Sequence, residues 1–182
     1  GGAGQGSFVG YLGRASYNFK DKYLLTGTIR RDGTSAFSPE NNRRWGTFPS
    51  FSAAWRVSQE DFFSESGLIS EMKIRASWGQ LGNSNTTSYP HIFRVSTTPD
   101  YGSGSTTIQA PTPINFVNKD VVWETVETID FGVDLGLFDN KVDLLVTYYD
   151  RTTKDFLYSL PLPNITGFGS TPVNLGSVSN KG

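Results

Sequence analysis

Hydrophobic and polar residues alternate with a period of two along much of this chain, which is the pattern of β-strands with one apolar and one polar face. In the run YLLTGTIRRD, Tyr23, Leu25 and Ile29 share one phase, and the other phase is mostly polar or charged. The runs of this kind are Val9–Phe19, Tyr23–Asp32, Phe51–Val57, Met72–Trp78, Ile129–Leu137 and Val142–Arg151. The pattern predicts an all-β fold, an antiparallel meander of at least six long strands.

The connections between the predicted strands alternate in length. Short polar turns join the first pair of strands at Asn18–Asp21 and the last pair at Phe138–Lys141, where Asn140 suits a positive φ. Much longer connections, Gly33–Gly46 and Gly82–Val122, follow the second and the fourth strand. Short and long connections are therefore expected at opposite ends of the meander.

Two stretches are less regular. The medium-length connection Ser58–Ser70 is expected to hold a short helix, with Ser58 and Asp61 as candidate capping residues. The stretch from Leu160 onwards is loop-like and becomes strand-like again near Val178. Because no linker-like segment divides the chain, residues 1–182 are expected to form one domain.

Alternation alone fits both a soluble β-sandwich and a membrane barrel. The predicted strands cover roughly 10 to 16 residues, whereas soluble strands cluster near 5 to 6 and a membrane strand needs about 9 to 11. Aromatic residues of the apolar phase gather near both strand ends, as at a membrane interface. They are Tyr17, Phe19, Tyr23, Trp55 and Phe138 at the short-turn end, and Tyr11, Trp78 and Tyr148 at the other. We therefore expect the apolar phase to face lipid and the charged phase to face a lumen, with a soluble β-sandwich carbohydrate-binding module as the alternative.

The amino-acid composition argues against several kinds of functional site. The chain has no Cys and a single His, so we predict no metal site and no cofactor, and the net charge of −1 without a basic stripe argues against nucleic-acid binding. Asp130 and Asp134 lie four residues apart on one predicted strand, a separation of roughly 13 Å that is too long for a retaining carboxylate pair. We expect no enzyme; a β-fold hydrolase, the third reading, would need a carboxylate pair or triad in a cleft.

The long loops carry the candidate binding residues, because loops longer than about 12 to 15 residues are usually functional or disordered. Aromatic side chains on such loops can stack on sugar rings or anchor a peptide. The candidate substrate-contacting residues are Trp45, Tyr89, His91 and Tyr101. Packing within the loops is the alternative role.

Four longer stretches occur in order along the chain: GRASYNFKDKYLLTGTIRRDGTSAF, NNRRWGTFPSFSAAWRVSQEDFF, MKIRASWGQLGN and WETVETIDFGVDLGLFDNKVDLLVTYYDRTTKDFLYSLPLP. TGF and NLGSVSNKG continue the series. Together they resemble successive barrel segments of the SusC/RagA family of TonB-dependent outer-membrane transporters.

The resemblance implies a large plugged barrel of about 22 strands that lies in the outer membrane as a multi-pass protein. It implies import of an oligosaccharide or a peptide, driven by the TonB complex, and pairing with a SusD-like surface lipoprotein. Residues 1–182 would be a partial barrel domain without the plug or the TonB box, since six or seven strands cannot close such a barrel. The loops after Asp32, Asn83 and Tyr158 would face the cell exterior.

Overall fold

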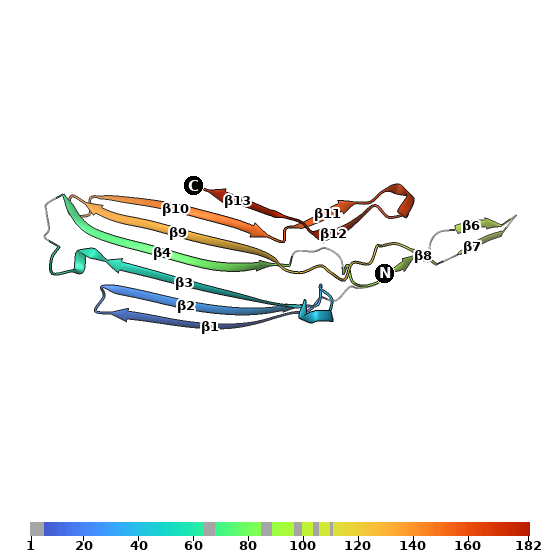
Figure 1. Cartoon of the computed structure of the whole chain (residues 1–182), viewed down its shortest axis with the longest axis horizontal. Helices are drawn as coiled ribbons and strands as arrows, with labels where there is room; N and C mark the ends of the chain where they lie inside the picture. Colours follow the sequence, from blue (N-terminus) through green and yellow to red (C-terminus); the bar gives the residue numbers. More distant parts are fainter. Residues whose placement is uncertain (1–5, 64–67, 85–88, 97–99, 104–105, 110) are drawn as a thin grey trace.

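The computed structural model describes residues 6–63, 68–84, 89–96, 100–103, 106–109 and 111–182. Its main element is one sheet of seven antiparallel strands in the order β1-β2-β3-β4-β9-β10-β13 (Figure 1). Six of these strands are long and confirm the predicted meander. They are β1 Phe8–Phe19, β2 Tyr23–Thr34, β3 Trp45–Arg56, β4 Ile69–Asn83, β9 Glu124–Leu137 and β10 Val142–Lys154.

The seventh strand, β13 (Ser177–Lys181), pairs with the last part of β10 and confirms the strand predicted near Val178. Three two-stranded hairpins occupy stretches that were predicted as loops. These are β5 (Val95–Ser96) with β8 (Thr112–Pro113), β6 (Asp100–Ser103) with β7 (Thr106–Gln109), and β11 (Leu157–Pro161) with β12 (Ser170–Asn174). All three hairpins lie at one end of the sheet, and the short turns lie at the other (Figure 1).

The short turns reverse direction through left-handed backbone conformations. Lys20 and Asp21 have φ of 53° and 54°, and the backbone N–H of Asp21 donates to the Asn18 side-chain oxygen at 3.0 Å. In the turn between β9 and β10, Asn140 has φ of 58°, as predicted. Asn and Asp tolerate this region better than other non-glycine residues, so these turns suit tight hairpins.

The connection after β3 differs from its prediction. It begins with a short 3₁₀ turn, Val57–Gln59, but Ser58 lies inside that turn and caps nothing, and its hydroxyl is buried without a partner. Asp61 forms an ion pair with Lys22 at 3.3 Å. Ser58 is therefore not the capping residue of this turn, and the stretch after Asp61 that Asp61 would cap includes residues outside the described part of the chain.

The apolar phase of the sheet forms a broad exposed surface, which we call the apolar face; the opposite side is the polar face. Ile29, Phe131 and Val146 are 55%, 50% and 58% exposed. The chain exposes 12,145 Å² in all, whereas a compact protein of 182 residues, about 20 kDa, exposes about 8,700 Å². A β-sandwich would bury its apolar faces against each other, so the described residues do not form one.

Aromatic rings line the apolar face near both strand ends. At the short-turn end, Tyr17, Phe19, Tyr23 and Trp55 form a chain of rings with centroids 6.3–6.4 Å apart. At the opposite end, Tyr11 stacks on Trp45 at 6.2 Å, and the Arg31 guanidinium lies over the Trp45 ring. The short-turn level and Tyr11 agree with the predicted placement of aromatic residues, whereas Tyr148 lies in the middle of β10 rather than near its end. Among the described residues, no helix is long and apolar enough to cross a membrane.

Glu60 ties the β3–β4 connection to the short-turn end. Its carboxylate accepts hydrogen bonds from the Tyr23 hydroxyl at 2.6 Å, the Trp55 indole at 3.0 Å and the Lys22 ammonium at 3.1 Å. These donors, the Tyr23 hydroxyl foremost, lower the pKa of Glu60 to about 2. The carboxylate is therefore ionised across the physiological pH range.

Glu60 should make the intact protein sensitive to acid. Because folding lowers the pKa of Glu60 from 4.5 to about 2, its stabilisation is complete above pH 4.5 and disappears as the pH falls toward 2. We expect Glu60→Gln to flatten the decline in urea midpoint between pH 5 and pH 2, whereas Asp61→Asn, at an exposed neighbour, should leave that decline in place. An unchanged slope in Glu60→Gln would contradict this assignment.

Candidate functional site

We take the polar face as the candidate functional surface. Its side chains form rows that run across the strands. The middle row joins β1, β2, β3, β4, β9 and β10 in register and consists almost entirely of hydroxyl groups. Its members are Ser16, Thr26, Ser52, Ser77, Asp130 and Tyr149, and we call it the hydroxyl row. A row of hydroxyl groups offers many hydrogen-bond donors and acceptors, and the surface that it forms is nearly flat.

Hydrogen bonds within the hydroxyl row link neighbouring strands. The Ser16 and Thr26 hydroxyls lie 3.2 Å apart, and the Ser77 hydroxyl donates to Asp130 at 3.2 Å. Just above the row, the Arg14 guanidinium donates to the Thr28 hydroxyl at 3.4 Å. The face is thus polar, and its side chains hydrogen-bond across neighbouring strands.

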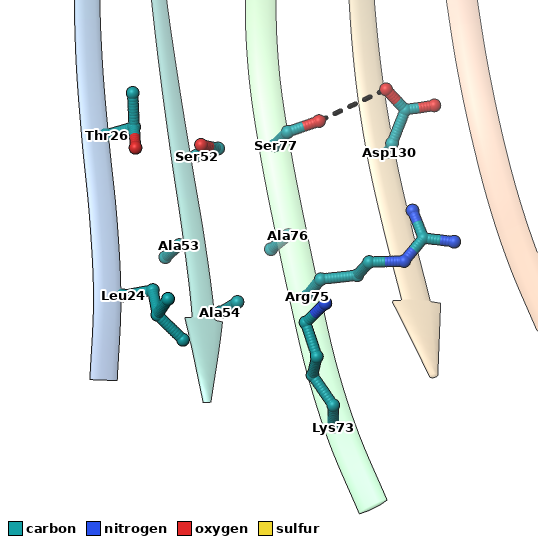
Figure 2. Close-up of a pocket in the computed structure, with 10 residues that line it drawn as sticks. All are labelled: Leu24, Thr26, Ser52, Ala53, Ala54, Lys73, Arg75, Ala76, Ser77 and Asp130. Carbon is teal, nitrogen blue, oxygen red and sulfur yellow. Dashed lines mark hydrogen bonds between the residues drawn. The ribbon is translucent and has the colours of Figure 1, made fainter. Parts of the chain in front are cut away.

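Arg75 is the centre of the charged part of this face. Its guanidinium extends from β4 across β9 (Figure 2), where it donates to Asp134 at 3.1 Å and to the Thr147 hydroxyl on β10. Lys73 lies 3.6 Å from the same carboxylate. The guanidinium passes closely over Gly132, where an added Cβ would lie 2.6 Å from the Arg75 guanidinium carbon and would push it aside. Arg75 therefore fixes the register of three strands.

A shallow hollow of about 270 Å³ lies beside Arg75 between β2, β3, β4 and β9. Figure 2 shows Ser77 and Asp130 at one end of it and Lys73 at the other. The two carboxylates do not share a site, since Asp130 pairs with Ser77 and Asp134 with Arg75 and Lys73. No group of three or more His, Cys, Asp or Glu side chains suited to a metal occurs in the described part of the chain. The hollow can hydrogen-bond a polar partner, but its groups have no arrangement for acid–base chemistry on a substrate.

At the loop end of the polar face, the long connections cover a small hydrophobic core, the loop-end cluster. It comprises Phe37, Phe48, Val121 and Trp123, with Leu157 packed against it. The rings of Phe37 and Phe48 meet Trp123 edge-on at 5.6 and 5.5 Å, and the Trp123 indole donates to the Arg44 carbonyl at 3.2 Å. The cluster joins the β2–β3 connection to the segment that precedes β9.

Phe48 reaches this cluster only because glycines make room for its ring. Added Cβ atoms at Gly46 and Gly82 would lie 2.3 and 1.9 Å from the Phe48 ring tip. Real Cβ atoms do not approach other atoms so closely, so larger residues at either position would displace the ring. The two glycines therefore determine how the loops dock on the sheet.

The structure places the predicted site residues in different surroundings. Trp45 is the first residue of β3 rather than a loop residue, and its stacking on Tyr11 puts it on the apolar face. Tyr89 and His91 lie together with ring centroids 6.2 Å apart. Tyr101 belongs to β6, in the hairpin that extends farthest from the sheet (Figure 1).

His91 is held inside the loop region. Its Nδ1 donates to the Ala36 carbonyl at 3.2 Å, which joins the segment after β4 to the β2–β3 connection. Burial lowers the pKa of His91 below its ordinary value, and the positive charges of Arg44 and Lys119 add to this effect. The neutral imidazole therefore acts here as a packing and hydrogen-bonding group.

The sequence analysis missed the loop-end cluster and the hydroxyl row. Phe48 was overlooked because it stands in the polar phase of its strand, opposite Arg30. An aromatic residue in the polar phase, close to a glycine, indicates that other segments cover that face locally. The stretch WGTF, with Phe48 two residues after Gly46, contains this signal. Predicting the hydroxyl row requires the register between neighbouring strands, which the sequence of one strand does not determine.

The chain is similar to one family along nearly its whole length. The family model described as TonB-dependent receptor-like, β-barrel matches residues 4–182. The chain is 37% identical over 169 residues to the TonB-dependent receptor P39 of Formosa agariphila, covering 93% of this chain and 16% of that protein. It is 34% identical over 185 residues to the TonB-dependent receptor SusC of Bacteroides thetaiotaomicron, covering 99% of this chain and 18% of that protein.

Solved structures agree with these sequence matches. The structure of the RagAB peptide transporter superimposes with a TM-score of 0.84 at 28% identity, covering 97% of this chain and 19% of that chain. The RagAB peptide importer matches in its 'closed-closed' and 'open-open' states with TM-scores of 0.82 and 0.79. The chain thus spans less than a fifth of the length of these relatives.

The glycines beneath Phe48 yield a stability prediction for the full-length protein. We expect Gly46→Ala and Gly82→Ala each to lower the free energy of unfolding by about 1–3 kcal/mol through overpacking, measured as a shift in urea midpoint. Gly27→Ala is the control, since nothing lies within 4 Å of its added Cβ. Phe48→Leu should relieve much of the Gly82→Ala penalty in the double variant; strictly additive losses would contradict the proposed clash.

Proposed function

Because this chain belongs to the TonB-dependent receptor-like β-barrel family, we propose that it forms part of the wall of an outer-membrane barrel that imports nutrients. The whole transporter would take up an oligosaccharide or a peptide, use energy from the TonB complex, and pair with a SusD-like surface lipoprotein. The relatives are receptors and a transporter rather than enzymes, which supports this proposal over catalysis. One observation of the molecule carries it: a single sheet that exposes an apolar face on one side and a charged face on the other.

The two faces have the properties that lipid and lumen require. On the apolar face a band of aliphatic, small and aromatic side chains, Phe51 and Phe131 among them, lies between the two levels of stacked rings, and such an apolar band suits the hydrocarbon core. Charged side chains such as Arg14, Arg75 and Asp134 lie on the polar face, where a wet lumen would hydrate them. We therefore assign the apolar face to lipid and the polar face to the lumen.

The open edges of the sheet support a larger barrel. Lipid offers no hydrogen-bond partners to a strand edge, so every crossing strand needs a neighbour on both sides. The outer edge of β1 and the part of β10 not paired with β13 would be covered by other strands of the same barrel.

The loop end would face the cell exterior. It carries the three hairpins and the loop-end cluster, and long loops on one side with short turns on the other are typical of outer-membrane barrels. Both states of the RagAB importer match this segment, which supports a wall that keeps its shape while other parts of a transporter move. Substrate contact by Trp45, Tyr89, His91 and Tyr101 stays a prediction, although Trp45 lies on the face that we assign to lipid.

Neighbouring residues on β10 provide a matched test of the face assignment. Val146 and Leu145 are 58% and 65% exposed on the apolar and the polar face. In the full-length transporter, Val146→Arg should impair assembly into the outer membrane, because an arginine on the lipid-facing side of a strand is destabilising, by up to about 2–4 kcal/mol. Leu145→Arg should assemble normally, since it lies across from Asp134 in the adjacent strand.

Assembly is measured as the amount of protease-resistant full-length barrel in isolated outer membranes. Val146→Leu, which keeps the side chain apolar, controls for packing changes at that position. Normal assembly of Val146→Arg together with failure of Leu145→Arg would reverse the assignment of lipid and lumen, and normal assembly of both would contradict a membrane location for this sheet.

A further inference from the structure

A second hollow, of about 420 Å³, lies on the polar face at the loop end, apart from the one beside Arg75. We call it the loop-end hollow. It lies where β3 and β4 stop pairing, since their ladder runs only from Ser50 and Gly79 to Arg56 and Lys73. The side chains that matter for its chemistry are Phe8, Arg30, Asp32, Leu81, Asn83 and Trp123.

The hollow has an aromatic side. Phe8 meets Trp123 edge-on with ring centroids 6.3 Å apart, and Trp123 is itself fixed within the loop-end cluster. Phe8 nevertheless stays 56% exposed, although it lies on the polar face of the sheet. Phe8 therefore presents an exposed ring face that Trp123 supports from one side.

The opposite side of the hollow is polar, planar and charge-compensated. The Arg30 Nε donates to both oxygens of Asp32, at 2.6 and 2.9 Å, and the Asp32 side chain is only 6% exposed. The Arg30 side chain is 48% exposed, so its terminal nitrogens remain available as donors. Gly10 leaves space over the pair, because an added Cβ would lie 2.7 Å from the Asp32 carboxylate.

The remaining acid near the hollow is already satisfied. The Glu124 carboxylate accepts from the Asn83 amide at 3.1 Å and from the Leu157 backbone N–H at 3.0 Å. These bonds hold the Asn83 amide in place at the edge of the hollow. The hollow therefore presents fixed, planar hydrogen-bonding groups without an uncompensated charge.

We propose that the loop-end hollow binds a sugar ring of an uncharged oligosaccharide. A sugar has an apolar ring face that stacks on an aromatic side chain and hydroxyls that pair with planar amide, guanidinium and carboxylate groups. The volume lies within the range of about 300–1,000 Å³ typical of small-molecule sites. An acidic sugar or a peptide with charged groups finds no free counter-charge here and is disfavoured.

This inference rests on the proposed function, because it takes the polar face to be the lumen wall. Bound at this height, the sugar would lie just inside the barrel, below the loops. The site would then act in capture at the entrance of the lumen rather than in energy coupling.

The test uses the purified full-length transporter and isothermal titration. The probes are maltoheptaose, laminarihexaose and xylohexaose as neutral oligosaccharides, trigalacturonate as an acidic one, and a tryptic digest of casein as a peptide source. We expect at least one neutral oligosaccharide to bind, and Phe8→Ala and Arg30→Lys each to raise its Kd by about tenfold. Arg30→Lys keeps a positive charge beside Asp32, which guards against misfolding.

Phe62→Ala is the matched control, since Phe62 is a similarly exposed phenylalanine, 68% exposed, at the short-turn end; its Kd should stay within about twofold of the parent. Binding of the peptide digest or trigalacturonate alone, or no binding by any neutral probe, would overturn the inference. So would a neutral ligand whose Kd is unchanged in both Phe8→Ala and Arg30→Lys. The proposed function fails separately, by the assembly of the β10 arginine variants, which needs no ligand.

Discussion

Every backbone N–H and C=O of a strand that crosses lipid must find its partner in a neighbouring strand. The six long strands pair in antiparallel ladders from β1–β2 through to β9–β10, and only the β3–β4 ladder stops well short of the strand ends, at Ser50 and Gly79. The same ladders decide where side chains lie, because a slip of one residue would move every side chain to the other face. Cross-strand contacts hold the register between β4 and β9: Arg75 with Asp134, Ser77 with Asp130, and Trp78 with Glu127.

The surface of the sheet is different beyond the point where the ladder between β3 and β4 ends. Phe48 enters the polar face there, over Gly46 and Gly82, and becomes the base on which the long connections pack. The same opening creates the loop-end hollow, with Phe8 and the Arg30–Asp32 pair at its sides. In the proposed transporter, the regular part of the sheet would separate lipid from the lumen, and its irregular end would recognise the ligand.

The long strands were predictable from the sequence because the signals for them lie within short stretches of the chain. Alternation along Tyr23–Asp32 or Val142–Arg151 identifies both the strand and its faces, and the turn residues identify the short-turn end. The hairpin β11–β12 was not recognised, since Pro161, Pro163 and Gly167 interrupt alternation and favour a loop reading. Strand β3 also begins six residues before its predicted start at Phe51, which moved Trp45 from a loop to the apolar face.

The loop-end features were beyond prediction for a different reason. Trp123 meets Phe37 and Phe48 through contacts between segments more than 70 residues apart, and such docking has no periodic signature in the chain. Asp32 is only 4% exposed and pairs with Arg30, and the alternation along its own strand does not predict this burial. Candidate ligand residues chosen for being aromatic and in a loop, such as His91, therefore included side chains that hold the loops together.

The central claim is that one face of this sheet lies in lipid and the other in water. It is tested most directly by placing a nitroxide spin label at each position from Tyr23 to Asp32 of the full-length transporter in lipid bilayers. Collision rates with oxygen, which concentrates in lipid, and with a water-soluble nickel chelate are then measured. Our account predicts oxygen maxima at Leu25, Gly27 and Ile29 and nickel maxima at Thr26, Thr28 and Arg30, out of phase with a period of two. Oxygen and nickel profiles that rise and fall together would contradict it.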